Sequence, residues 1–254
     1  MALVPGATTV TLGSTAHAAW SDASRGDLRP TGPARGDAGP LVRFADDLAA
    51  VTSTRIDRVA WVTQVHGADV VISAGTPGGG GAPDVVHAGT ADALVTTTPG
   101  TALCIFTADC APLALSSPEG IVGAVHAGWH GLLAGVVEAA VGAMHAQGAS
   151  EVTASLGPCI HAACYEFSPG DLDRVADRYG DGVRGSTTGG RPALDLAAGV
   201  AAAVAVSGAV LVDGVDECTA CGGDNFSHRA RADVGRQAML VWSTATGDDG
   251  AGAR

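Results

Sequence analysis

Three residues at the ends of apolar runs have side chains that could hold a metal ion. His66, Cys110 and His126 each end or follow a short run with the pattern of a buried strand, and function commonly lies in loops at strand ends. Two imidazoles and one thiolate suit Zn²⁺ and leave a fourth position for water or substrate. Their separations of 44 and 16 residues match no zinc-finger spacing. Alternatively, Cys110 is an ordinary buried thiol and the histidines only satisfy hydrogen bonds.

The distribution of histidines favours a metal environment over an anion-binding pocket. Six of the eight histidines lie between residues 59 and 173, a window that contains ten acidic residues and no arginine. Histidines that replace other polar groups on a surface would give the same count.

Other residues could assist such a site. Asp109, beside Cys110, could orient a ligand or transfer a proton, or it could be a solvent-exposed acid. The turn Gly128-Trp129-His130-Gly131 precedes a predicted helix, whose first N–H groups could bind an anion. Arg229, Arg231 and Arg236 form the densest basic cluster, which could hold a phosphate or a carboxylate, or simply be solvated.

The remaining cysteines give weaker signals. Cys218 and Cys221 form a C-x-x-C motif, but no second such motif completes a four-thiolate site, and the setting is not that of a thioredoxin. We expect core packing for this pair, and structural roles for Cys104, Cys159 and Cys164. Six cysteines are too few for a disulfide scaffold in a chain of this length, which favours a cytoplasmic location.

Composition excludes several classes of protein. The chain of 254 residues has 26 acidic and 14 basic residues, a formal charge of −12, and no lysine. P-loop, pyridoxal-lysine and protein-kinase chemistries all need a lysine, and the negative charge disfavours nucleic acid. No apolar stretch reaches the ~20 residues of a membrane span, and no positive charge precedes the leader-like Ala16-His17-Ala18.

The hydrophobic pattern predicts an α/β (α+β) fold with mixed β-sheets flanked by helices, in a single domain over residues 1–254. We expect an irregular N-terminal part (1–57), with one short helix, and a motif-bearing core (58–243). Residues 21–40 and 76–82 have the composition of loops. Strands are predicted at 58–65, 93–97, 103–107, 112–116, 121–125, 151–156, 209–212 and 239–242, and helices at 43–51, 131–147, 171–179 and 194–206.

Together these motifs resemble one family, over about residues 61–242. The chain is similar to the YfiH family, also called the multicopper polyphenol oxidase or laccase-domain family and the peptidoglycan editing factor family. The segments that carry the resemblance, in order, are Gln64-Val65-His66-Gly67, Ala91-Asp92-Ala93-Leu94-Val95-Thr96, Thr107-Ala108-Asp109-Cys110-Ala111-Pro112, Val125-His126-Ala127-Gly128-Trp129, Leu156-Gly157-Pro158-Cys159-Ile160, Tyr165-Glu166, Leu194-Asp195-Leu196, Cys218-Thr219 and Phe226-Ser227-His228-Arg229.

The resemblance implies a layered fold related to cytotoxic-necrotising-factor-like hydrolases, with His66, Cys110 and His126 as zinc ligands. It implies phosphorolysis of adenosine, inosine, guanosine and methylthioadenosine, with deamination of adenosine. The partners would be purine nucleosides and phosphate. We expect catalytic roles for the three ligands and Asp109, and substrate-binding roles for the four residues Gln64, His130, Arg229 and Arg236.

The chain departs from the family at positions that normally carry arginine. It has Trp129-His130-Gly131 where the family has Trp-Arg-Gly, and Asn225-Phe226-Ser227-His228-Arg229-Ala230 where the family has Phe-Phe-Ser-Tyr-Arg-Arg. Of the N-terminal Ser-Thr-Arg-x-Gly-Gly motif, only Ser14-Thr15-Ala16 is in place, whereas Gly235-Arg236 matches. Histidine does not replace the planar donor set of arginine.

Three other functions compete with a zinc-dependent phosphorylase. Cys110 and His126 could act as nucleophile and base in a hydrolase or amidase that edits peptidoglycan precursors. A copper-dependent polyphenol oxidase would need more histidines and usually a methionine ligand, and no methionine lies near the motifs. A paralogue with reduced activity would keep the metal site but lack the arginines.

Overall fold

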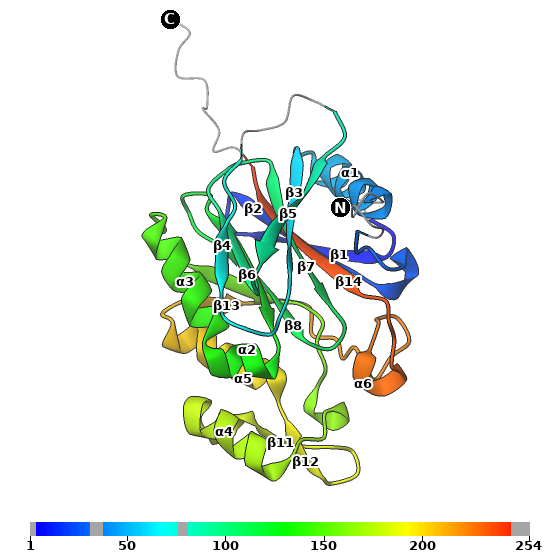
Figure 1. The fold of residues 1–254 in the computed structure, drawn as a ribbon, viewed down its shortest axis with the longest axis vertical. Coiled ribbons are helices and arrows are strands. Elements are labelled where there is room, and N and C mark those ends of the chain that lie inside the picture. Colours follow the sequence, from blue (N-terminus) through cyan, green and yellow to red (C-terminus); the bar gives the residue numbers. More distant parts are fainter. Residues whose placement is uncertain (1–3, 31–37, 76–80, 245–254) are drawn as a thin grey trace, which may run out of the picture.

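Two mixed six-stranded sheets form the centre of the protein (Figure 1). The structure is a computed structural model that describes residues 4–30, 38–75 and 81–244. The first sheet has the order β1 (Ala7–Leu12), β2 (Ala16–Ser21), β14 (Gln237–Ser243), β7 (Thr101–Thr107), β3 (Arg58–Thr63) and β5 (Asp84–Thr90). The second has the order β13 (Val210–Val212), β10 (Thr153–Leu156), β8 (Ala111–Ser116), β9 (Val122–Ala127), β6 (Ala93–Thr96) and β4 (Val70–Ile72).

The sheets pack face to face, and helices cover their outer faces. Alternating side chains such as Leu103 and Ile105 of β7 meet Ala124 of β9 between the sheets. Helix α1 (Gly39–Thr52) buries Phe44 and Leu48 against the first sheet. Helices α2 (Trp129–Ala134), α3 (Val136–Ala146), α4 (Pro169–Tyr179) and α5 (Leu196–Val206) share a core with the second sheet (Figure 1). The predicted mixture of sheets and flanking helices is therefore confirmed.

Helix α3 does not continue α2, although one helix was predicted over both. Gly135 separates them with a φ of +86°, in the left-handed region that glycine adopts without strain. Its N–H caps the end of α2 by donating to the carbonyls of Gly131 and Leu132. Apolar residues continue at helical spacing on both sides of Gly135, so the sequence pattern alone predicts a single helix.

The prediction of an irregular N-terminal part is wrong. Strands β1 and β2 pair antiparallel, and β2 continues the sheet through β14. Three of the six residues of β1 are threonines, two of them adjacent, so this partly buried edge strand has no clear hydrophobic alternation, which explains why the sequence did not reveal it. Loops were predicted at 21–40 and 76–82, and parts of both, residues 31–37 and 76–80, lie outside the described residues. Within 21–40 the structure has a short 3-10 helix at Ala23–Arg25 and the start of α1.

The site lies where both sheets end. His66 follows β3 of the first sheet, Cys110 lies in the connection from β7 to β8, and His126 is in β9 of the second sheet. Strands β11 (Arg184–Ser186) and β12 (Pro192–Leu194) form a separate hairpin, and α6 (His228–Arg231) is a single turn beside the pocket. None of the helices in the described ranges is long and apolar enough to span a bilayer.

Candidate metal centre and substrate pocket

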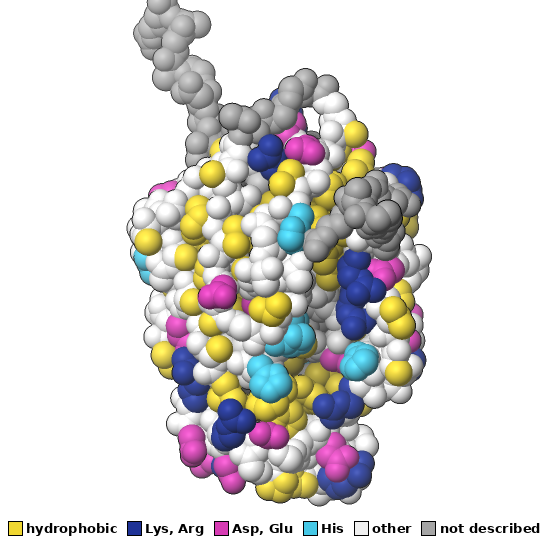
Figure 2. Space-filling view, viewed as in Figure 1, with side chains coloured by type: hydrophobic (Ala, Val, Ile, Leu, Met, Phe, Trp, Pro, Cys, Tyr) yellow, Lys and Arg dark blue, Asp and Glu magenta, His cyan; other side chains and the backbone are white. Residues whose placement is uncertain are grey.

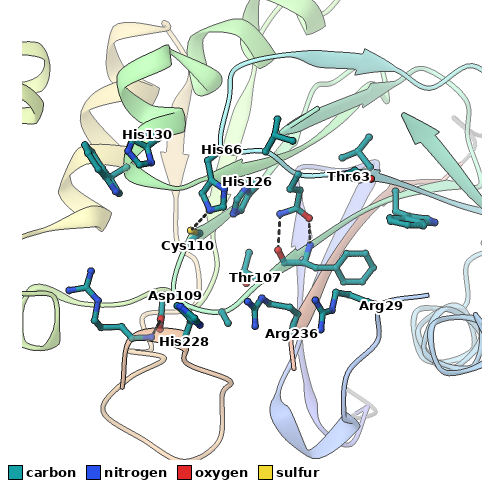
Figure 3. Close-up of a pocket in the computed structure, with 18 of the residues that line it drawn as sticks. Arg29, Thr63, His66, Thr107, Asp109, Cys110, His126, His130, His228 and Arg236 are labelled. Carbon is teal, nitrogen blue, oxygen red and sulfur yellow. Dashed lines mark hydrogen bonds between the residues drawn. The ribbon is translucent and has the colours of Figure 1, made fainter. Parts of the chain in front are cut away.

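The three predicted ligands converge. The ligand atoms of His66, Cys110 and His126 all lie within 4.8 Å of one another, and Cys110 Sγ is 3.8 Å from His66 Nε2 (Figure 3). His126 is buried, Cys110 is partly buried and His66 is exposed, so the group opens toward solvent on the His66 side. Three protein ligands with one open side are the arrangement of a catalytic rather than a structural zinc site.

Asp92 holds two of the predicted ligands in place. Its Oδ1 accepts hydrogen bonds from His126 Nδ1 at 2.8 Å and from the backbone N–H of His66 at 2.9 Å. Its Oδ2 accepts the N–H groups of Gly67 at 2.6 Å and Val65 at 3.1 Å. These bonds stabilise the turn in which His66 adopts a φ of +61°, which is unusual for a residue other than glycine.

The same carboxylate determines the tautomer of His126. An ionised carboxylate only accepts hydrogen bonds, so Nδ1 of His126 carries a proton, and Nε2 is the nitrogen that can bind a metal once its own proton is released. Asp92 lies in one of the segments that carry the family resemblance, but its role was not predicted from the sequence. The available signal was a single acidic residue immediately before an apolar strand.

The electrostatics of the group favour the thiolate. Burial raises the pKa of Cys110, but the neighbouring His126 and His66 outweigh burial and lower it to about 6. Burial lowers the pKa of His126, whereas the Cys110 thiolate and Asp92 raise it to about 9. The thiolate is the form in which cysteine binds a metal, and metal binding then releases the histidine proton.

Gly128 leaves room for the ligands. A Cβ at this position would lie 3.0 Å from Cys110 Sγ and 3.0 Å from His66 Cδ2. The backbone angles, −78° and 165°, suit any residue, so the constraint is space and not conformation.

We therefore expect Gly128→Ala to displace the ligands without unfolding the protein. Metal affinity should fall by about 10-fold to 100-fold, the usual effect of disturbing groups that position ligands. Titration with zinc against a competing chelator measures this. Gly142→Ala in α3 is the control, because a Cβ there meets nothing within 4 Å. Equal affinities for the two variants would contradict the prediction.

The ligands lie in the wall of a pocket with a volume of about 1010 Å³. Histidine and arginine side chains gather on the face that contains it (Figure 2). Its aromatic lining residues are Trp61, Phe106, Trp129 and Tyr165. Polar and charged side chains, including the arginines and histidines, make up much of the rest of the lining. A concave site that combines aromatic and polar groups can hold a small molecule in a defined orientation.

Two arginines of the pocket lie side by side. Arg236 and Arg29 are neighbours opposite the ligands (Figure 3), and burial together with the charge of Arg29 lowers the pKa of Arg236. Arg236 donates to the carbonyls of Asp233, Val234 and Gly235. Arg29 was not predicted as a pocket residue, because it lies in an N-terminal loop without any hydrophobic pattern.

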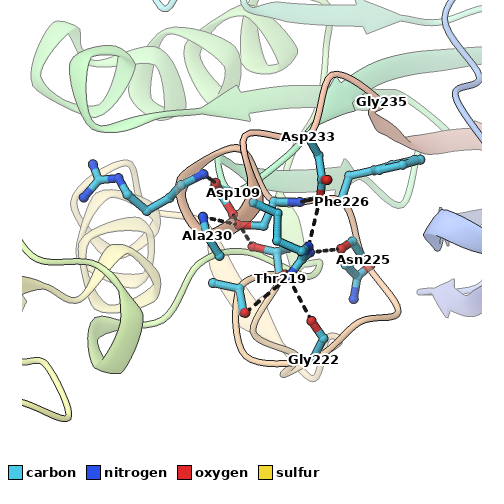
Figure 4. A network of polar contacts seen from close by, with 12 residues as sticks. Asp109, Thr219, Gly222, Asn225, Phe226, Ala230, Asp233 and Gly235 are labelled. Carbon is cyan, nitrogen blue, oxygen red and sulfur yellow. Dashed lines mark hydrogen bonds and ion pairs between the residues drawn. The ribbon is translucent and has the colours of Figure 1, made fainter.

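The structure gives Asp109 a different contact from the expected one. Its carboxylate accepts hydrogen bonds from Thr219 Oγ1 and Ser227 Oγ, each at 2.7 Å, and from the Arg229 N–H at 2.6 Å (Figure 4). Asp109 therefore holds the 219–229 loop beside the pocket, and the ligand-orienting position is that of Asp92. A role for Asp109 in proton transfer stays a prediction.

The other predicted substrate-binding residues also line the pocket, and they differ in the contacts that their side chains already make within the protein. Both ends of the Gln64 amide bond the backbone of Phe106 at 2.8 Å, so Gln64 positions that aromatic residue. His130 is exposed and packs on Trp129, with ring centroids 3.7 Å apart. The Arg229 guanidinium lies over Tyr165 and donates to the Glu166 carbonyl.

Comparison with known proteins shows the family to which the chain belongs. Residues 31–244 match the family described as multi-copper polyphenol oxidoreductase laccase, and the chain belongs to this family, the YfiH family. Purine nucleoside phosphorylase ORF3 of Streptomyces griseus is 41% identical over 210 residues, 78% of this chain and 83% of that protein. Purine nucleoside phosphorylase YfiH of Escherichia coli is 33% identical over 187 residues, 72% of each chain. The crystal structure of the Bacillus licheniformis hypothetical protein YfiH shares the fold, with a TM-score of 0.72 at 20% identity over 89% of this chain and 92% of that one.

Proposed function

We propose that the chain is a zinc-dependent purine nucleoside phosphorylase that also deaminates adenosine. The observation that carries the proposal is the convergence of His66, Cys110 and His126 in the wall of a pocket with aromatic and arginine side chains. The names of the relatives support an enzyme of this kind. Adenosine, inosine, guanosine and methylthioadenosine are the proposed substrates, with phosphate as the second reactant.

The residues present fit zinc better than copper. One thiolate and two imidazoles, one of them oriented by Asp92, form a typical zinc donor set. The methionines of the described residues, Met144 and Met239, are buried in the core and offer no ligand to the pocket. When bound, zinc would supply a Lewis acid and would lower the pKa of water.

The residues of the chain suggest how phosphorolysis proceeds. The aromatic wall would hold the flat purine, while Arg236 and Arg29 would attract and orient phosphate. Phosphate oxygen then bonds to C1′ of the ribose as the bond from C1′ to the base nitrogen breaks, and negative charge moves onto the departing purine. Groups positioned before the reaction stabilise such charge most effectively. His130 and Arg229, which also line the pocket, would cover the bound nucleoside and phosphate.

One observation favours a second candidate function. Cys110, His126 and Asp92 have the order of a nucleophile, a base and an orienting acid. A hydrolase or amidase of peptidoglycan precursors would use these residues without a metal. Removal of the metal separates the two functions, because a thiol nucleophile stays active in the chelated protein.

The direct test is to incubate the purified protein with adenosine, with and without phosphate, and to separate the products by chromatography. We expect adenine that depends on phosphate, a smaller amount of inosine, and zinc in the preparation. Stoichiometric zinc with neither product would contradict the proposal.

Arg236→Gln should raise the KM for phosphate by about tenfold or more, since a hydrogen bond to a charged group is worth about 1.5–3 kcal/mol. The KM for the nucleoside should change little. Initial rates at varied phosphate measure the effect. The control is Arg184→Gln, which removes only surface ion pairs with Asp173 and Asp181. The same phosphate KM in both variants would refute the role of Arg236.

A further inference from the structure

A second group of metal-ligating side chains lies outside the pocket. Among the residues that the structure describes, the sulfurs of Cys164, Cys218 and Cys221 lie within 4.8 Å of one another. Cys164 ends the 3-10 helix Ala162–Cys164, and the other two form the C-x-x-C turn more than fifty residues later. Three thiols from two separate segments of the chain thus meet at one place.

Core packing, which the sequence suggested for the C-x-x-C pair, does not explain this group. Cys221 is exposed, and Cys164 and Cys218 are only partly buried. The fully packed cysteines of this chain are instead Cys104 and Cys159. Partly exposed thiols that face one another gain little from the hydrophobic effect, so their convergence calls for another explanation.

The spacing of the sulfurs suits a tetrahedral ion. Zn–S bonds of about 2.3 Å place ligand sulfurs about 3.8 Å apart, inside the observed limit of 4.8 Å. The Cys164 and Cys221 sulfurs, 2.9 Å apart, would separate as an ion enters. Cys218 Sγ already accepts the backbone N–H of His161 at 3.4 Å, a contact that orients it. A disulfide would use only two of the three sulfurs.

We propose that Cys164, Cys218 and Cys221 bind a second zinc ion as three thiolates, with solvent at the fourth position on the exposed Cys221 side. This site is separate from the pocket ligands and does not depend on the proposed reaction. The donor set is all sulfur, so it would also take other thiophilic cations such as Cd²⁺.

The second ion would stabilise one wall of the pocket. The residue after Cys164 is Tyr165, which packs under the Arg229 guanidinium. The residue after Cys218 is Thr219, which binds Asp109. The Arg231 guanidinium holds the same loop from within by donating to the carbonyls of Thr219, Ala220, Gly222 and Asn225 (Figure 4). A zinc ion would therefore join the segment of Tyr165 to the loop of Arg229.

Metal content of the reduced, full-length protein tests the proposal. We expect two equivalents of zinc in the unmodified chain, one in Cys110→Ser, one in Cys221→Ser, and none in the double variant. Asp216→Asn is the matched control, an exposed acid two residues before Cys218, and it should retain two equivalents. Circular dichroism checks that each variant is folded.

Cadmium titration gives a second readout that does not depend on activity. Absorbance from thiolate-to-cadmium charge transfer should be about three times greater per ion at this site than at the single-thiolate pocket site. A reduced Cys110→Ser chain that binds neither zinc nor cadmium would overturn the proposal. A purified protein with a Cys164–Cys221 disulfide that takes up no zinc after reduction would overturn it as well.

Discussion

Cys110→Ser should remove the pocket metal and lower kcat/KM for phosphorolysis of adenosine by about a thousandfold or more. The serine hydroxyl is a poor zinc ligand, and only the imidazoles of His66 and His126 would remain. Charge stabilisation by a catalytic metal is worth several kcal/mol, and about 4 kcal/mol corresponds to a thousandfold in rate. Nothing else in the pocket offers a sulfur, since Cys110 is its single cysteine among the lining residues that the structure describes.

The measurement combines zinc analysis with initial rates of adenine formation. Cys104→Ala is the matched control, because this fully buried thiol lies in β7 outside the pocket, and the variant should keep metal and activity. Phosphate-dependent adenine from a zinc-free Cys110→Ser chain would show that the site is wrongly assigned. Full activity of the unmodified chain after chelation would instead support the thiol nucleophile.

The second large effect is expected for Asp92→Asn. The carboxylate is fully buried and accepts four hydrogen bonds, three of them from the backbone of residues 65–67. An amide has one acceptor oxygen, and its NH₂ group would face N–H donors. Each buried donor left without a partner costs about 1–3 kcal/mol, so the free energy of unfolding should fall by about 3 kcal/mol. Metal affinity should fall by about 10-fold to 100-fold.

Denaturant unfolding and zinc titration measure the two consequences of this substitution separately. Asp69→Asn is the control, because Asp69 is exposed and lies three residues after His66. It should leave both quantities unchanged. If Asp92→Asn kept the stability and the affinity of the unmodified chain, Asp92 would not be the residue that holds the ligands.

Much of the fold follows from hydrophobic patterning, and the limits of the prediction have physical causes. Strands β7, β8 and β9 are buried along their whole length and consist mostly of apolar residues, because both faces are covered, and they were predicted close to their observed bounds. Strand β1 was missed because only one of its six residues is fully buried.

In the candidate site, too, some residues could be predicted from the sequence and others could not. The three candidate ligands could be selected because imidazole and thiolate groups are common metal donors and because these residues lie at or near the ends of predictable strands. The structure brings the three side chains together. Asp92 acts through distant partners, the residues of the 65–67 turn and His126. Arg29 pairs with the nearby Asp27 but also donates to the distant carbonyl of Val234. No local pattern indicates which distant segments will meet these two residues. Asp109 has the right neighbour in sequence, but its φ of +93° belongs to a bend after β7, and its carboxylate reaches the loop at Thr219 instead of the ligands.

The origin of the three ligands has a consequence for how the protein assembles. His66 belongs to the end of one sheet, His126 belongs to the other, and Cys110 lies in the segment that crosses between them. A bound ion would therefore act as a cross-link between the two layers, and it could be captured only after they have docked. An ion that binds only to the native state stabilises that state by its free energy of binding. Metal supply would then control the lifetime of the folded enzyme as well as its turnover.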